Sequence, residues 1–155
     1  RYDRGVLGHE VIAPYVQSTP DGRALFSLPG HASRPLPYLG YAPGAYLGGV
    51  TDWILKQAGV PVHLDRVYET DMAEGLKVMA LEGHGIAFLP RSAVKKEIQA
   101  GTLVEVGLPD GQTLALSMEV RAYREKTGAK PGFNSSAHQL WLHLTQSTSA
   151  VHSSR

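Results

Sequence analysis

The stretch that decides the fold is LEGHGIAFLP, residues Leu81–Pro90. It places a glycine, one polar residue and a second glycine before a short apolar run that ends in proline. Gly83 is expected to adopt a left-handed backbone and to stop a preceding helix, because glycine has no Cβ to clash there. Gly85 then turns the chain into a strand that continues to Leu89, and its unbroken apolar character is typical of burial on both faces. Pro90 ends that strand and turns the chain towards the next helix.

The segments on either side of this joint alternate between strand and helix. Upstream, a strand at 37–41 and the helical spacing within 42–59 precede a second strand at 62–70. The next helix is predicted to begin at Asp71, which with Glu74 three residues later is typical of a capping box. A short helix at 91–101 and a strand at 102–107 follow. This alternation predicts an α/β fold with parallel strands.

The two ends of the chain have different patterns. An extended run at 8–17 leads into a long connection that is rich in proline and glycine. After a turn signal at 109–111, apolar residues alternate over 113–123, the pattern of a half-buried strand. A last helix is predicted to begin at Asn134 or Ser135, and the small polar residues after it are expected to fray.

Composition excludes several classes of protein. Apolar residues make up 43% of the 155 residues and charged residues 19%, which is typical of a globular chain without a membrane span. The absence of cysteine excludes disulfides, thiolate nucleophiles and cysteine metal sites, and it fits a cytoplasmic location. A net charge of +1 is too small for this segment to bind nucleic acid through a basic field. Because the chain begins with Arg1, it is expected to be a fragment of a longer polypeptide.

No motif in the sequence predicts catalysis or a bound cofactor. The glycines at 44–49 lack the spacing of a dinucleotide loop and the lysine of a phosphate-binding loop. His138 and His143 are five residues apart on the predicted last helix, which places them off a common face and disfavours zinc. The serines stand in no nucleophile context. The chain is therefore predicted to be neither an enzyme nor a metal or cofactor protein.

A general argument about parallel sheets still predicts a ligand site. Ligands bind beyond the carboxyl ends of the strands, where helix N-termini present free backbone N–H groups. In this sequence the junctions of that kind lie at 41–47, 69–72 and 89–92. They favour a small polar or anionic ligand, although ordinary solvent-facing turns would have the same composition. The predicted ligand-binding residues are Pro43, Gly44, Tyr46, Thr70 and Asp71.

The central segment resembles a known family. ETDMAEGLKVMALEGHGIAFLPRSAVKKEIQAGTLVEV, residues Glu69–Val106, resembles the effector-binding domain of LysR-type transcriptional regulators. In order, it contains a strand, a helix, a glycine-x-glycine-isoleucine step, an apolar run with leucine-proline, a second helix and a glycine-x-leucine-valine strand. LPYLGYAPGAYLGG upstream, and LALSMEVRAYREK and HQLWLHL downstream, fall where that family has such segments. The likeness extends over Gly8–Leu144.

The resemblance implies a fold and a domain organisation. It implies an α/β, periplasmic-binding-protein-like (type 2) lobe with hinge strands and an incomplete first lobe. On that map residues 1–13 are the first hinge strand region, and residues 14–113 form the second regulatory lobe. Residues 114–155 would be the return strand and the C-terminal helix of the first lobe, with a frayed tail. An absent first lobe would remove half of the effector cleft's wall.

The resemblance also implies a function and partners. The chain would be the effector- or oxidant-sensing part of a bacterial regulator, without a membrane partner. It would form homo-oligomers, and it would reach DNA only through a missing N-terminal domain. Two alternatives remain at this point. One is a fragment of a periplasmic-type solute-binding protein, which would share the fold, and the other is a small-molecule enzyme, which the missing catalytic cluster disfavours.

Within the family, two stretches are similar to the hypochlorite-responsive subgroup. These are PLPYLGYAPGAYLG and DMAEGLKVMALEGHGIAFLP, and that subgroup is linked with sensing through methionine oxidation. The candidate redox-sensing residues are the three methionines, Met72, Met79 and Met118. Met72 and Met79 are seven residues apart, so one packed helical face is expected to carry both. Oxidation would make a side chain on that face polar, but the same positions also suit simple core packing.

Overall fold

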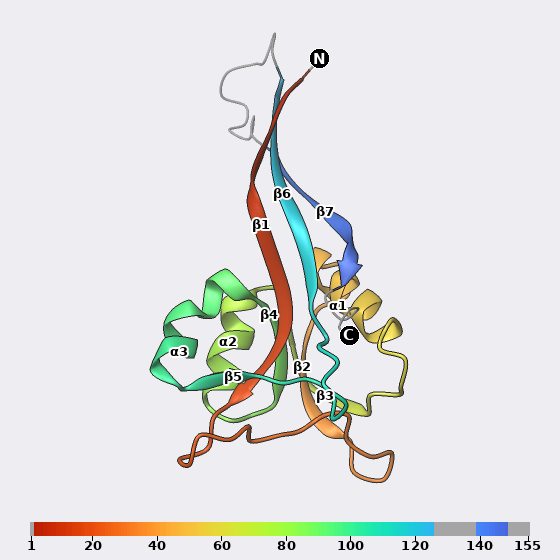
Figure 1. The fold of residues 1–155 in the computed structure, drawn as a ribbon, viewed down its shortest axis with the longest axis vertical. Coiled ribbons are helices and arrows are strands. Elements are labelled where there is room, and N and C mark those ends of the chain that lie inside the picture. The colour runs from red at the N-terminus through yellow and green to blue at the C-terminus, as the bar shows by residue number, and fades with distance from the viewer. Residues whose placement is uncertain (1, 126–138, 149–155) are drawn as a thin grey trace.

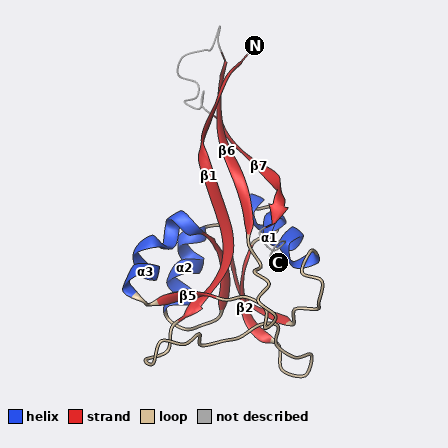
Figure 2. Ribbon diagram, in the orientation of Figure 1, coloured by secondary structure: helices blue, strands red, loops and turns tan. Residues whose placement is uncertain are grey.

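The computed structural model describes residues 2–125 and 139–148, and describes side-chain burial for residues 8–119. Seven strands form one sheet, which helices flank on both sides (Figures 1 and 2). The strands are β1 Tyr2–Gln17, β2 Leu36–Tyr41, β3 Leu64–Thr70, β4 Ile86–Pro90, β5 Leu103–Glu105, β6 Leu116–Glu125 and β7 Gln139–Thr148. The helices are α1 Tyr46–Lys56, α2 Ala73–Leu81, the 3₁₀ helix η1 Arg91–Val94 and α3 Lys95–Ala100.

The sheet is mixed, and only its first part matches the parallel arrangement predicted from the sequence. The strand order is β3-β2-β4-β1-β6-β7, with β5 paired to β1. β2 lies parallel to both β3 and β4, whereas β1 is antiparallel to β4, β5 and β6. Figure 1 shows β1 and β6 leaving the body of the molecule together as a long ribbon. β3 therefore forms one edge of the sheet, and no other described strand pairs with its outer side.

The glycine joint has the predicted geometry. Gly83 has φ 84° and follows α2, and the next amide donates back to the Met79 carbonyl at 3.1 Å. Gly85 is buried at the point where β4 passes β2, and a Cβ there would lie 2.6 Å from the Pro37 carbonyl oxygen. The four residues that follow, Ile86–Leu89, are all buried. The prediction of a central strand buried on both faces is confirmed.

The side chains of β4 alternate between two hydrophobic clusters, one on each face of the sheet. Ile86 and Phe88 belong to the cluster that α1 covers, together with Val50 and Ile54 of that helix. Ala87 and Leu89 belong to the other cluster, with Leu76 and Ala80 of α2. Burial of one large apolar side chain of this kind is worth about 1.5–3 kcal/mol, so this alternation fixes β4 between its two layers.

The predicted capping box at the start of α2 is wrong. The helix begins at Ala73, with Met72 as the N-cap residue and no side-chain hydrogen bond at the cap. The Thr70 hydroxyl accepts from the Met72 amide at 3.3 Å, so a turn made by threonine precedes the helix. Asp71 lies inside that turn, one residue too early to cap the helix.

The predicted C-terminal helix is also wrong within the described residues. Gln139–Thr148 forms β7, which pairs antiparallel with β6 through partners that include Tyr123 and Gln139. The sequence holds a period-two signal at Leu140, Leu142 and Leu144, and pairing with β6 selects that period over the helical one. The predicted helix start at 134–135 lies outside the described residues.

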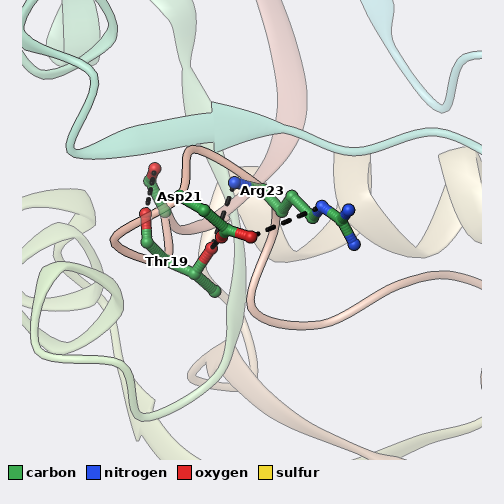
Figure 3. A network of polar contacts seen from close by, with 4 residues as sticks. Thr19, Asp21 and Arg23 are labelled. Carbon is green, nitrogen blue, oxygen red and sulfur yellow. Dashed lines mark hydrogen bonds and ion pairs between the residues drawn. The ribbon is translucent and has the colours of Figure 1, made fainter.

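The connection after β1 is closed by a small polar network (Figure 3). The Thr19 hydroxyl donates to the Asp21 carboxylate and accepts from the Arg23 amide at 3.1 Å. The Arg23 guanidinium lies 3.6 Å from the same carboxylate, and both side chains are exposed. Exposed ion pairs of this type contribute at most about 1 kcal/mol, so the backbone hydrogen bonds between Thr19 and Arg23 are the main constraint on the turn.

A more buried ion pair joins α2 to the segment after β4. The Lys77 ammonium lies 3.2 Å from Glu97 and 3.4 Å from Glu74, and it donates to the Ala93 carbonyl at 3.1 Å. Burial alone would lower the pKa of Lys77, but its hydrogen bonds to the two carboxylates outweigh burial and raise that pKa. A hydrogen bond from its own backbone amide lowers the pKa of Glu97, and Lys77 lowers it further.

The Lys77–Glu97 pair predicts an acid-dependent loss of stability. Because the folded pKa of Glu97 is lowered from its ordinary 4.5, its contribution is complete above that value and is lost as the pH falls through the folded pKa. Chemical unfolding at pH values on either side of 4.5 should show a steeper loss for the native chain than for Glu97→Gln. Glu82→Gln, in an exposed pair with His84, is the matched control and should leave the slope unchanged. Equal slopes in all three proteins would contradict the prediction.

No helix in the described part of the chain combines the length and apolar character needed to cross a membrane.

Candidate ligand groove between α1 and the β2–β3 edge

A groove of about 690 Å³ lies between α1 and the edge of the sheet formed by β2 and β3. Its position follows from the turn after β2, because the chain leaves Tyr41, passes Pro43 and Gly44, and enters α1 at Tyr46. The groove is open on one side to solvent. The residues that line it are Tyr38, Tyr41, Ala42, Pro43, Gly44, Ala45, Tyr46, Gly48, Gly49, Val50, Asp52, Trp53, Arg66 and Glu69.

The flank of α1 explains why this region is hollow. Tyr46, Gly49 and Trp53 are spaced i, i+3 and i+7, which places them on one side of the helix. A Cβ built on Gly49 would have no heavy atom within 4 Å. Gly49 is exposed, so it leaves this flank of α1 without a side chain between the positions of two aromatic residues. At the mouth of the groove, Gly44 has φ 89°, a conformation that a larger residue would strain.

The floor of the groove is occupied by a guanidinium from the edge strand. Arg66 donates through Nη1 to the Tyr41 carbonyl at 2.8 Å, and its Cζ lies 5.2 Å from the centre of the Tyr38 ring. The same nitrogen is 3.8 Å from a Glu69 carboxylate oxygen. A Cβ on Gly40 would overlap the guanidinium, so this position of Arg66 depends on glycine in β2.

The charges of the groove favour a negative potential. Its lining contains one cation, Arg66, and two carboxylates, Asp52 and Glu69, which leaves a net charge of −1. Burial raises the pKa of Tyr38 to about 12, against the effect of Arg66 and with a contribution from Asp52. Burial also raises the pKa of Tyr41. Both phenols are therefore neutral donors or apolar walls at physiological pH, and they do not offset the carboxylates.

Three of the five predicted ligand-binding residues lie together. Pro43, Gly44 and Tyr46 line the groove, whereas Thr70 and Asp71 do not. The Thr70 side chain contacts α2, because a Cβ built on Gly75 would be 3.3 Å from the Thr70 Cγ2 atom. The turn after β3 is thus engaged with α2 and does not face the groove.

The third strand-end junction is occupied by the chain itself. Ser92, at the start of η1, donates through its amide to Glu10 at 3.2 Å and through its hydroxyl to the other oxygen of the same carboxylate at 2.5 Å. Arg91 lies 3.1 Å from Glu105. An anion at this helix start would have to displace Glu10. Of the turns at the three junctions predicted to bind a ligand, only the turn after β2 therefore lines the groove.

Sequence reasoning missed the groove residues that lie outside the predicted junctions, among them Asp52, Trp53 and Arg66. The spacing of Tyr46, Gly49 and Trp53 on one helical flank could have indicated the α1 side of the groove. Arg66 carries no comparable signal, because its placement depends on the register between β2 and β3. That register shifts between Tyr38 and Leu39.

The three methionines do not form one cluster. Met72 is 61% exposed and precedes α2, so the expectation that it shares a packed stripe with Met79 is wrong. Met79 is partly buried against the α2 side of the sheet, and Met118 is fully buried on the α1 side. Within the described residues, no group of three or more histidine, aspartate or glutamate side chains is arranged to hold a metal ion.

The sequence matches one family model and two curated proteins. Residues 29–135 match the family model of the LysR substrate binding domain. The chain is 30% identical over 145 residues to the HTH-type transcriptional regulator YjiE of Escherichia coli strain K12, which covers 94% of this chain and 44% of that protein. It is 29% identical to the HTH domain-truncated transcriptional regulator QseD of Escherichia coli O157:H7, over 94% of this chain and 55% of that protein. The chain thus spans about half the length of the curated relatives it matches.

Solved structures of regulators share the fold. The regulatory domain of HypT from Salmonella typhimurium superposes with a TM-score of 0.70 at 25% identity, covering 84% of this chain and 59% of that chain. The full-length structure of HypT, described as a hypochlorite-specific LysR-type transcriptional regulator, gives a TM-score of 0.71 over 84% of this chain and 42% of its own. These likenesses confirm the expected periplasmic-binding-protein-like (type 2) α/β architecture.

Proposed function

This chain belongs to the LysR substrate binding domain family, and we propose from that membership that it is the effector-sensing part of a bacterial transcriptional regulator. The curated relatives are transcriptional regulators by name, and the similar structures include their regulatory domains. The alternative of a solute-binding protein is not favoured, because neither curated relative is a transport protein. As part of the proposal, the whole regulator is cytoplasmic, forms homo-oligomers and contacts DNA through an N-terminal domain.

We propose that the effector occupies the groove between α1 and the β2–β3 edge. The observation that carries this proposal is the groove itself, which opens beyond the carboxyl end of β2 and is lined by the flank of α1 that carries Tyr46, Gly49 and Trp53. Pro43 and Gly44 supply the mouth of the site. A ligand there would contact a helix flank and a sheet edge at the same time, so its binding would be coupled to the packing of α1 on the sheet.

A second candidate signal is oxidation of methionine. A HypT protein at 25% identity is described as hypochlorite-specific, and this likeness supports the proposal for this chain. Met72 is the most accessible of the three methionines, and Met118 is the most protected. Graded hypochlorite treatment followed by peptide mass spectrometry should therefore find sulfoxide at Met72 first, at Met79 next and at Met118 last. Early oxidation of Met118 would contradict this order.

A promoter reporter in the organism that encodes the regulator separates the two signals. If the groove receives the effector, Gly49→Leu in the full-length regulator should reduce effector sensitivity by about tenfold or more, a loss of about 1.4 kcal/mol in binding. Combined Met72→Ile, Met79→Ile and Met118→Ile should leave that response intact, because the volumes are similar.

If oxidation is the signal, the variant with all three methionines replaced should instead lose the response to hypochlorite. If deletion of the gene for the regulator changed no transcript level in the cell, the proposed regulatory function would be rejected.

A further inference from the structure

The groove already binds one organic cation, which is the guanidinium of its own Arg66. That group lies over the Tyr38 ring with Cζ 5.2 Å from its centre, donates to the Tyr41 carbonyl at 2.8 Å and lies 3.8 Å from Glu69. An aromatic face, a carbonyl oxygen and a carboxylate are the partners that a guanidinium or ammonium group prefers. The floor of the groove therefore has the chemistry of a cation site.

The rest of the groove extends that chemistry into open space. Tyr46 and Trp53 both line the groove, and the negative face of an aromatic ring attracts a cation. Asp52 precedes Trp53 in α1, is exposed and also lines the groove. Arg66 lies 3.8 Å from Glu69, and with Asp52 counted the groove lining keeps a net charge of −1.

Two features act in the opposite direction. The N-terminus of α1 contributes a partial positive charge at the mouth of the groove, and Arg66 is itself a cation that an anion could approach. The helix contribution is equivalent to roughly half a charge, whereas the lining as a whole carries −1. The engagement of Arg66 with three groups of the protein also leaves it poorly placed to receive a ligand carboxylate. The balance favours a cation over the anion that strand-end geometry alone predicts.

We propose that the groove binds a small organic cation, with a guanidinium, amidinium or ammonium group near Asp52 and an apolar body between Tyr46 and Trp53. This inference rests on the proposed role of the groove as the ligand site. It names the chemical class of the ligand. Gly49 leaves room for the apolar body, because this groove-lining position has no side chain and a Cβ there would have no heavy atom within 4 Å.

Three probes of nearly identical shape test the charge preference. Benzamidinium, benzamide and benzoate share one ring and differ only in a positive, neutral or negative head group. In NMR titrations of the chain, benzamidinium is expected to bind about tenfold or more tightly than either of the other two, the effect of one desolvated charge–aromatic and charge–carboxylate contact. Equal binding of all three, stronger binding of benzoate or no binding of any probe would overturn the proposal.

Substitutions locate the binding to the groove. Asp52→Asn is expected to weaken benzamidinium about fivefold or more, while Glu82→Gln, an equal change of charge at an exposed residue outside the groove, should not change its affinity. Gly49→Leu should abolish binding without backbone strain, because Gly49 is helical and leucine is a stronger helix former. Unchanged affinity in both groove variants would overturn the proposal.

Removal of the internal cation gives the sharpest result. Arg66→Met keeps much of the aliphatic length and takes away the guanidinium, so benzamidinium should bind more tightly to this variant than to the native chain. An anion site built on Arg66 would instead lose benzoate binding in the same variant. Thermal melts confirm that each variant is folded before titration. These outcomes are independent of the promoter test. A normal promoter response combined with stronger binding of benzoate would contradict the proposed ligand class but not the regulatory function.

Discussion

Replacement of Gly85 by alanine is expected to lower the free energy of unfolding by about 3 kcal/mol, the upper end of the usual range for overpacking a well-packed interior. The added Cβ would lie 2.6 Å from the Pro37 carbonyl oxygen, 3.0 Å from the Pro37 carbonyl carbon and 3.1 Å from Leu39 Cγ. Two of these three atoms are backbone of β2, which is held in the sheet by β3 on its other side. β4 and β2 would have to separate to make room.

Gly101→Ala is the matched control for Gly85→Ala. Gly101 has φ 76° after α3, and a Cβ there has no neighbour within 4 Å. Its cost is limited to the left-handed backbone, about 1–2 kcal/mol for a residue with a side chain. Urea unfolding of both variants should therefore rank Gly85→Ala as the more destabilised. The reverse ranking would show that β4 and β2 are not packed as closely as the structure has them.

Phe88→Ala is expected to cost about 3–5 kcal/mol, the usual range for removal of a buried aromatic ring. Phe88 is 1% exposed and meets Tyr38 edge to face, with ring centres 6.4 Å apart and planes at 80°. Loss of the ring would leave a cavity between β4 and α1 and would remove the support of the Tyr38 ring at the floor of the groove. Phe88→Leu, which fills more of the space, should cost less.

The control for Phe88→Ala lies on the edge strand. Val67 is 53% exposed, and Val67→Ala should change stability by no more than about 0.5 kcal/mol. Calorimetric melts of the three variants give the comparison directly. A Phe88→Ala protein as stable as Val67→Ala would contradict the central position of β4 in the core.

Local signals predicted the part of the fold that local physics decides. Gly83 and Gly101 both have the left-handed backbone that stops a helix, and Ile86–Leu89 is the buried strand that its unbroken apolar run indicated. The antiparallel direction of β1 could not be read from sequence, because it is set by where a strand pairs and not by its own pattern. The segment at 139–148 carries both a helical and a period-two pattern, and pairing with β6 decides between them.

The candidate site was predictable only where it follows one strand end. Pro43, Gly44 and Tyr46 were expected from the rule that ligands gather beyond the carboxyl ends of parallel strands, and the structure brings these three together. The same rule gave Thr70 and Asp71, but that turn is engaged with α2. Arg66 could not be predicted, because it reaches the groove only through the register of β3 against β2 and through the absence of a side chain at Gly40.

The contact between Glu10 and Ser92 has a mechanical consequence for β1. Two hydrogen bonds from Ser92 fix Glu10 to the body of the molecule, just before Ile12, where pairing with β4 begins. If β1 and β6 rotate together relative to the α/β body, a hinge on the N-terminal side of Glu10 leaves both hydrogen bonds intact. A hinge on the C-terminal side of Glu10 would break both hydrogen bonds to Ser92 and the pairing between β1 and β4. Any such motion is therefore expected to involve the part of β1 before Glu10, while the hydrogen bonds to Ser92 keep Glu10 fixed to the body of the molecule.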